Sequence, residues 1–360
     1  MNRKKSILVI IQRSNGDVYY SLSLIKILKT YYQDSYIDIL VNDDTYSTAA
    51  FSKEIRKIIS FSYNEKQKRG LRYLLDISKL IFRKYDLSIS LTSSDRSILF
   101  AIISAKKSIG MIEKEKSKSW WKRFLLTNFF FYDTNTHAFI QTHTPLDILG
   151  IKYTREFAKD ALLENIPEEK RINEKLKKLN IEKFIIFHPS AQYEYKVYPE
   201  KQRLKLLEYL NQFGIPIIIT GGKTHIDLTI KSSLPKSKNL YDFIGETTLS
   251  EFFYLSKQSI GFIGMDTLNI HIAASQNKRI FGIYGPTIVK KWSPWSNKSK
   301  AVEKFDRITS YENITIFQGG FSCVPCGKKG CNDCGISDCF NDIDPKVIKL
   351  EIKKWIYENY

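Results

Sequence analysis

Short apolar runs alternate along the chain with segments of helical periodicity. Residues Ile7 to Ile11 form such a run and predict a buried strand. In the next segment, apolar residues at 24, 25, 28, 31 and 32 form a stripe with the helical period, and Ile37 to Val41 predict a second strand. Strand, turn, helix and strand in this order form a βαβ unit, so we expect the chain to open with a parallel sheet.

The second half of the chain repeats this order. We expect a strand at 184–187, a helix at 202–213 and a strand at 215–219. The stretch 259–295 then adds an apolar run, the turn Gly264-Met265-Asp266-Thr267, a helix through His271 and a strand at 280–284. Repeated βαβ units predict an α/β fold with doubly wound sheets.

A chain of 360 residues suits two domains better than one. We expect an N-terminal Rossmann-like domain over 1–165 and a C-terminal one over 166–345, facing each other across a cleft, with a charged passage between them near 153–178. A terminal helix over 346–360 follows, for which we consider packing back on the N-terminal domain.

Two segments are rich in basic residues. Residues 53–84 alternate basic and apolar positions and are interpreted as solvated helices or a mobile segment. Residues 114–132 (KEKSKSWWKRFLLTNFFFY) combine cations with Trp120, Trp121 and a cluster of phenylalanines. Such a segment can lie at a membrane interface with its rings in the headgroup layer, or it can be a core element between helices.

Polar residues gather where the predicted strands end. Gly16 and Asp17 follow the first strand, and Asp266 and Thr267 open a helix after a later one. Free N–H groups and the positive dipole end at such a helix start favour an anionic group, most simply a diphosphate. The competing interpretation is helix capping by Asp17, Asp266 or Thr267, and simple packing for His271, four residues after Thr267.

The formal net charge of +18 indicates an anionic partner, such as a nucleotide, a nucleic acid or a phosphorylated membrane surface. No apolar run approaches the length of a membrane span. The run after the basic N-terminus is short and meets Arg13 and Asp17, which is unlike a signal peptide, so we expect a cytoplasmic protein.

All five cysteines lie close together near the C-terminus, in the pattern C-x₂-C-x₄-C-x₂-C-x₄-C. Two Cys-x₂-Cys pairs are typical of zinc sites, although this spacer between the pairs is shorter than in zinc ribbons. A structural zinc or iron, reduced thiols in a compact loop, and a disulfide all stay open for Cys323, Cys326, Cys331, Cys334 and Cys339.

Five blocks of this sequence resemble glycosyltransferase family nine, the heptosyltransferases of lipopolysaccharide core assembly. They are similar to the family in order and spacing and cover most of the chain: ILVIIQRSNGDVYY, YDLSISLTSSDRSILFAIISAKKSIGM, FHPSAQYEYKVYPE, IITGG, and FIGMDTLNIHIAA with IYGPT and WSPW. The chain departs from the family pattern at Leu268, where Gly is usual, at Tyr198, where Trp is usual, and at Ser190-Ala191, which replace Gly.

The resemblance implies a GT-B fold and inverting sugar transfer, with no metal required for catalysis. Asp17 would be the general base, with Ser14, Gly16 and Arg96 on the acceptor side. Lys196 and the backbone at Thr267 would hold the diphosphate, Asp266 would touch the sugar and His271 would support the phosphate loop. The full donor-side set would be Ser190, Lys196, Gly221, Thr247, Asp266, Thr267, Leu268 and His271.

The partners implied by the resemblance are a nucleotide sugar, with ADP-heptose first, and an anionic saccharide lipid at the inner face of the membrane. Another nucleotide sugar or a protein acceptor is the alternative. A NAD-dependent Rossmann oxidoreductase would need a Gly-x-Gly-x-x-Gly turn, which neither 14–18 nor 261–266 supplies. A nucleic-acid binder would gather its basic residues around the cysteines, whereas here they are spread, so we expect no nucleic-acid partner.

Overall fold

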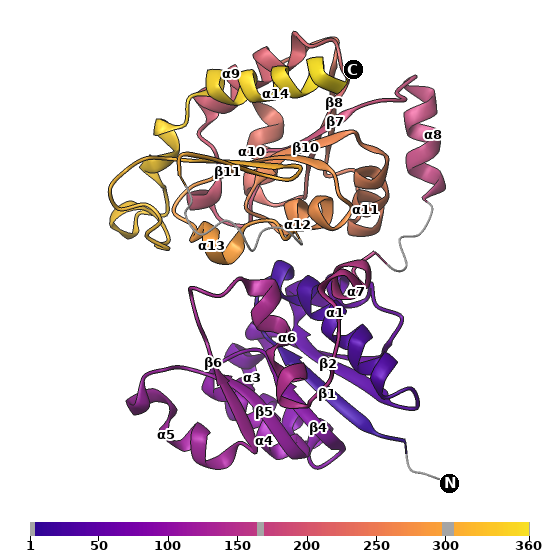
Figure 1. Ribbon diagram of the computed structural model, residues 1–360, viewed down its shortest axis with the longest axis vertical. Helices are drawn as coiled ribbons and strands as arrows, with labels where there is room; N and C mark the ends of the chain where they lie inside the picture. The colour runs from indigo at the N-terminus through magenta and orange to yellow at the C-terminus, as the bar shows by residue number, and fades with distance from the viewer. Residues whose placement is uncertain (1–3, 164–168, 297–305, 360) are drawn as a thin grey trace. The chain divides into compact units, whose positions relative to one another are not determined.

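The computed structural model describes residues 4–163, 169–296 and 306–359. The chain divides into two compact units, Met1–Asn165 and Ile166–Tyr360. The first unit is a parallel sheet and the second a mainly parallel one, each with helices packed on it, drawn in indigo to magenta and in magenta to yellow in Figure 1. The expected passage 153–178 includes residues 164–168, which lie outside the described part of the chain.

The sheet of the first unit has the strand order β3-β2-β1-β4-β5-β6, with all strands parallel. The order runs outward from β1 in both directions, so it reverses between β1 and β4. The elements are β1 Ser6–Ile11, α1 Asn15–Tyr31, β2 Tyr36–Asn42, α2 Tyr46–Ala49, β3 Ile55–Phe61, α3 Tyr63–Ile81, β4 Tyr85–Ser90, α4 Asp95–Ser104, β5 Ala105–Ile112, α5 Lys116–Leu125, β6 Asn128–Phe131, α6 Ala138–Ile148 and α7 Arg155–Asp160.

Alternate residues of the first sheet build a core with α3 and α4. Leu8 and Ile10 of β1 pack with Phe61 of β3, and α3 adds Tyr73 and Ile77 to the same buried cluster. The interpretation of 53–84 as solvated helices or a mobile segment fits the exposed side of α3 but misses the strand β3 and the buried side of α3. The strand β3 was hidden because only its C-terminal residues are buried, and the apolar side of α3 closes over them.

The second unit repeats the topology with the order β12-β13-β11-β10-β7-β8-β9, in which only β12 is antiparallel. Here the order reverses between β7 and β10, which are paired. The elements are α8 Lys170–Lys178, β7 Ile185–His188, α9 Glu200–Asn211, β8 Ile217–Gly221, α10 His225–Ser232, β9 Leu240–Ile244, α11 Leu249–Gln258, β10 Gly261–Met265, α12 Leu268–Ser275, β11 Arg279–Tyr284, α13 Val289–Trp292, β12 Ile308–Tyr311, β13 Ile314–Gln318 and α14 Pro345–Asn359.

The terminal helix α14 packs within the second unit. Its buried residues Ile348, Ile352 and Trp355 join the cluster formed by β7, β8, β10 and β11. The centroid of the Trp355 ring lies 5.8 Å from that of the Phe281 ring on β11. The helix α14, drawn in yellow in Figure 1, also contacts α9. The apolar side of this helix is therefore covered by its own unit.

Candidate active site

The helix α12 begins where β10 ends, beside the reversal of strand order in the second unit. Thr267 is at the N-cap position with extended backbone, and among the described residues no side-chain hydrogen bond from it caps the helix. Its hydroxyl instead makes a long contact of 3.5 Å with the Met265 carbonyl. The first turn of α12, which starts at Leu268, therefore lies at the carboxyl edge of the sheet, where the N–H groups of a helix start favour an anion.

Asp266, one residue before this helix start, holds two partners through one carboxylate oxygen. The Lys196 Nζ lies 2.6 Å from Oδ2, and the Thr287 hydroxyl donates to the same atom at 2.8 Å. The Asp266 side chain is only 7% exposed, whereas that of Lys196 is 27% exposed. The carboxylate is thus an internal anchor that fixes the lysine at the carboxyl ends of β10 and β11.

The predicted residues Ser190 and Gly221 meet around a carboxylate that the sequence analysis missed. Burial raises the pKa of Asp227, but hydrogen bonds from Ser190, from the Thr224 hydroxyl and from the backbone at Thr224 and Gly222 lower it below its usual value. A Cβ at Gly221 would come within 2.9 Å of Asp227 Oδ1. Ser190 and Gly221 therefore shape the ends of β7 and β8, and Asp227 could have been suspected only from its capping box with Thr224.

The two histidines of this region are buried. His271 lies on the inner side of α12. His188 ends β7, and its Nδ1 is 2.9 Å from the Thr220 hydroxyl. Burial lowers the pKa of His188 to about 4, although nearby Asp227 opposes the shift, so this ring is neutral at pH 7. The predicted donor residue Thr247 is partly buried and precedes Thr248, which caps α11.

In the first unit, Asp17 lies in the first turn of α1 rather than at its cap, which is the position of Ser14. The Ser14 hydroxyl donates to Asp17 Oδ2 at 2.7 Å, and Arg13 Nε is 3.1 Å from Oδ1. Burial would lower the pKa of Arg13, but Asp17 and Tyr132 more than offset it and raise the pKa. The predicted residues Ser14, Gly16 and Asp17 are adjacent, and Arg13, four residues before Asp17, was missed.

Arg96 lies in the first turn of α4, next to the same end of β1. Its Nε donates to Gln12 Oε1 at 3.2 Å and its NH2 donates to the Tyr63 hydroxyl at 2.9 Å. The guanidinium also stacks over the Phe61 ring at 4.0 Å. These three partners are neutral and hold the guanidinium beside the end of β1. Gln12 directly precedes Arg13, which links the Arg96 and Asp17 contacts along the chain.

Residues 323–340, here called the cysteine loop, contain all five cysteines, and these are free thiols. Burial, together with the nearby thiols of Cys331, Cys326 and Cys323, raises the pKa of Cys339 to about 12. Within the described ranges, no group of three or more His, Cys, Asp or Glu side chains is arranged to hold a metal ion. The structural zinc or iron considered for Cys323, Cys326, Cys331, Cys334 and Cys339 therefore has no support.

The cysteine loop packs against the segment that carries Thr287. The Gly327 N–H donates to the Pro286 carbonyl at 2.7 Å. A Cβ at Gly285 would clash with the Phe340 ring unless that ring shifted. Gln318 of β13 donates to the carbonyls of Gly285 and Thr287 at 2.8 and 2.9 Å. The Thr287 contact to Asp266 is thus supported from behind by this loop.

Comparison with known proteins identifies the family of this chain. Residues 75–313 match the family described as glycosyltransferase family 9 (heptosyltransferase). The lipopolysaccharide heptosyltransferase 3 of Escherichia coli (strain K12) is 24% identical over 299 residues, which cover 79% of this chain and 83% of that protein. No described helix has the length and apolar character needed to cross a membrane.

Two solved structures share the fold over almost the whole chain. The family 9 glycosyltransferase of Veillonella parvula superposes with a TM-score of 0.76 at 16% identity, covering 100% of this chain and 99% of that one. The E. coli heptosyltransferase WaaC, solved with ADP, superposes with a TM-score of 0.70 at 14% identity, covering 97% and 99%. The predicted GT-B fold with two Rossmann-like units is confirmed, and the chain belongs to glycosyltransferase family 9 and is a glycosyltransferase.

Proposed function

We propose that this protein transfers a heptose from ADP-heptose to a lipopolysaccharide core or a related saccharide acceptor, with inversion at the anomeric carbon. The observation that carries the donor half is the Lys196–Asp266 pair beside the uncapped start of α12. The WaaC structures with ADP and with ADP-2-deoxy-2-fluoro heptose support this choice of donor, because they share the fold.

The donor diphosphate is proposed to bind at the carboxyl edge of the second sheet. The first-turn N–H groups of α12 supply oriented donors and the positive end of the helix dipole. Lys196 adds a full positive charge whose position Asp266 and Thr287 determine. Asp266 then acts on the donor mainly through its lysine, while Ser190, Gly221, Thr247, Leu268 and His271 shape or support the surrounding site.

The acceptor hydroxyl is proposed to lose its proton to Asp17. The first turn of α1 holds this carboxylate, and Arg13 and Ser14 orient its two oxygens. Displacement at an anomeric carbon needs an activated nucleophile on one face and a stabilised leaving group on the other, which gives inversion in one step. Arg96, with Gly16 and Ser14, is assigned to acceptor binding.

The charge on the departing diphosphate is proposed to be neutralised by Lys196 and α12 in place of a catalytic metal. A lysine ammonium is a compact point charge on a flexible stem, which suits a leaving group that moves away. An anionic saccharide lipid as acceptor would also bring the protein to the cytoplasmic face of the inner membrane as a peripheral protein.

A thermal-shift panel of ADP, UDP, GDP, CDP and NAD tests the donor. We expect ADP to raise the melting temperature most, because a ligand that binds only the folded state stabilises it. Stabilisation by NAD alone would contradict sugar transfer and favour an oxidoreductase.

The Asp17→Asn variant tests the acceptor half. We expect it to fold, to keep its ADP-induced stabilisation and to lose turnover by about 10²- to 10⁴-fold, the usual contribution of a positioned base. Asp34→Asn, at an exposed position after α1, is the control and should retain activity. Full turnover by Asp17→Asn would remove Asp17 from this role.

A further inference from the structure

Helix α5 and strand β6 present large apolar side chains to solvent. Trp120 is 68% exposed and Phe124 is 86% exposed, and the two residues are one turn apart on the same helix face. The surface that they begin, here called the α5–β6 surface, comprises Trp120, Phe124, Leu125, Phe129 and Phe131. Clustered exposed rings on a folded protein indicate an interaction site rather than a solvated face.

The strand and helix parts of this surface are joined by Arg123. Phe129 and Phe131 point outward from the edge strand β6, with their ring centroids 5.6 Å apart. The Arg123 guanidinium lies 5.8 Å from the first centroid and 5.0 Å from the second. The cation of α5 therefore reaches both rings of β6, so the helix and strand parts of the surface meet at Arg123.

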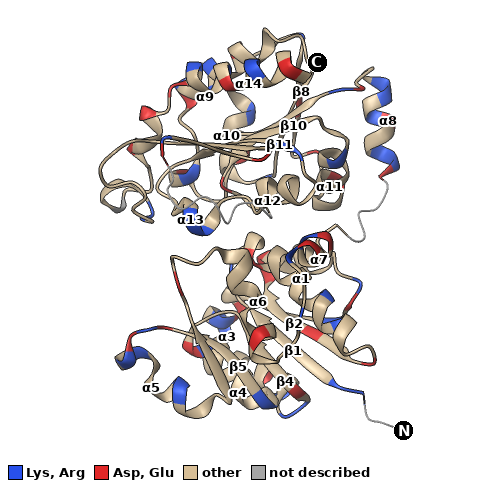
Figure 2. Ribbon diagram, viewed as in Figure 1, with Lys and Arg blue, Asp and Glu red and all other residues tan. Residues whose placement is uncertain are grey.

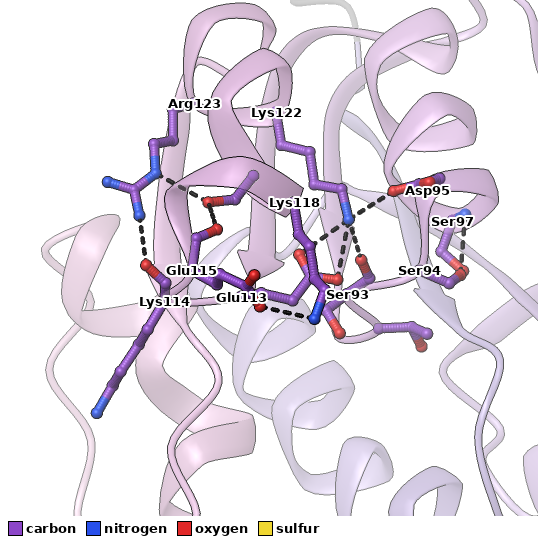
Figure 3. Close-up of polar contacts among 12 residues, drawn as sticks. Ser93, Ser94, Asp95, Ser97, Glu113, Lys114, Glu115, Lys118, Lys122 and Arg123 are labelled. Carbon is purple, nitrogen blue, oxygen red and sulfur yellow. Dashed lines mark hydrogen bonds and ion pairs between the residues drawn. The ribbon is translucent and has the colours of Figure 1, made fainter.

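The exposure of these rings is not the result of a loosely held helix. Lys122 is 1% exposed and its Nζ lies 2.6 Å from the Ser93 carbonyl, 2.7 Å from Asp95 and 2.9 Å from Glu113 (Figure 3). Trp121 packs inward on the buried cluster of Ile98, Ile112 and Leu126. The helix is thus fixed by one tryptophan and one buried lysine, so its other tryptophan has to face outward.

The charge around the α5–β6 surface narrows the choice of partner. Residues 113–132 contain five basic and two acidic side chains, and Figure 2 shows Lys and Arg along α5. Lys116 and Lys118 are exposed beside Trp120. A second copy of a chain with net charge +18 would be repelled, whereas an anionic lipid surface offers both opposite charge and apolar depth.

We propose that the α5–β6 surface docks the protein on an anionic lipid bilayer, with Trp120 and Phe124 in the headgroup layer and the lysines on lipid phosphates. Lys122 then joins the docked helix to Ser93 and Asp95, the loop that leads into Arg96. The biological reason for docking rests on the proposed lipid-linked acceptor. Vesicle binding needs neither donor nor acceptor, so its failure is separable from a failure of that function.

The test is sedimentation of the full-length protein with vesicles containing one third phosphatidylglycerol in phosphatidylcholine, against pure phosphatidylcholine. We expect binding to the anionic vesicles and at least tenfold weaker partitioning for Trp120→Glu/Phe124→Glu. The matched control is Leu71→Glu/Leu75→Glu, which adds the same two charges one turn apart on α3 of the same unit, at positions that are 76% and 55% exposed. That control should partition within twofold of the wild type.

Two results would overturn the proposal. One is equal vesicle binding by the wild type and Trp120→Glu/Phe124→Glu, and the other is an equal loss in Leu71→Glu/Leu75→Glu, which would indicate a general charge effect. Because Trp120 and Phe124 are exposed, the double variant should keep the wild-type melting temperature and ADP-induced shift. A double variant that keeps vesicle binding but changes the oligomeric state by light scattering would show that a second copy covers the surface.

Discussion

At the residue scale, Asp266 determines what Lys196 can do. A carboxylate that is 7% exposed and shared by a lysine and a threonine is a fixed support rather than a flexible contact to the sugar. The resemblance assigned Asp266 a sugar contact, and the geometry favours a positioning role through Lys196. Thr287, the threonine that contacts Asp266, belongs to the family-like segment IYGPT. No periodicity in the sequence, however, predicts that it contacts Asp266, because a helix and a strand lie between them.

Substitution Lys196→Gln should lower kcat/KM by about 10²- to 10³-fold, because a preorganised charge on the leaving group is lost. Steady-state kinetics with ADP-heptose and an acceptor saccharide measure this change. Lys201→Gln removes a lysine at an exposed position of α9 and should have little effect.

The same variant leaves the buried Asp266 without its cation, so the loss in kcat/KM has to be separated from a loss of stability. The double variant Lys196→Gln/Asp266→Asn removes that unpaired charge. We expect it to recover the urea midpoint of the wild type without recovering turnover. Recovery of both would show that Lys196 is only structural.

Two buried histidines make stability depend on pH. Burial lowers the pKa of His143, in α6 of the first unit, and of His188, in the second unit, to about 4, from about 6.5 in the unfolded chain. Between these values the unfolded state binds more protons, so stability is present at pH 7 and is lost as the pH falls through this window. At pH 5 each unit should lose about 2 kcal/mol in urea unfolding. An unchanged urea midpoint between pH 7 and pH 5 would contradict buried neutral histidines.

At the element scale, apolar periodicity predicts strands and helices well where burial is complete. The strands at 7–11 and 37–41 and the helix through His271 are confirmed as β1, β2 and α12. The strand β3 could not be recognised, since its exposed N-terminal half carries Arg56 and Lys57. For 114–132, the partly buried Trp121 packs on a buried cluster, as the core alternative expects, whereas the membrane-interface alternative stays a prediction.

The cysteine loop shows how an element outside the site can act on it. Phe340 is buried against Gly285, and its ring meets that of Tyr198 edge-on at 6.2 Å. Substitution Phe340→Ala should destabilise the second unit by about 3 kcal/mol and weaken ADP binding, because the support behind Thr287 is lost. Urea unfolding and an ADP titration measure the two effects.

The matched control for this variant is Phe321→Ala. Phe321 lies in the same part of the chain but is 42% exposed, so its removal should change stability by less than about 0.5 kcal/mol. Wild-type ADP affinity in Phe340→Ala would mean that the loop contributes only to folding.

At the scale of the whole molecule, the repeated βαβ order was enough to predict two Rossmann-like units. What could not be predicted is which side chains meet at the strand ends, because those contacts join segments far apart in the chain. Ser190 and Asp227, or Arg96 and Tyr63, are brought together only when parallel strands align their carboxyl ends. The resemblance to family 9 supplied residue roles, and the structure supplies the neighbours through which those roles would operate.

Both units reverse their strand order, but they place their candidate chemistry on different sides of the reversal. In chain order, Asp17 follows β1, the first strand of its unit, whereas Asp266 follows β10, the fourth strand of its unit. Each half therefore carries its own core and its own recognition edge, and a change in one edge need not disturb the other. Under the proposed reaction, a lineage can acquire a new acceptor by remodelling one half while inheriting its nucleotide preference intact.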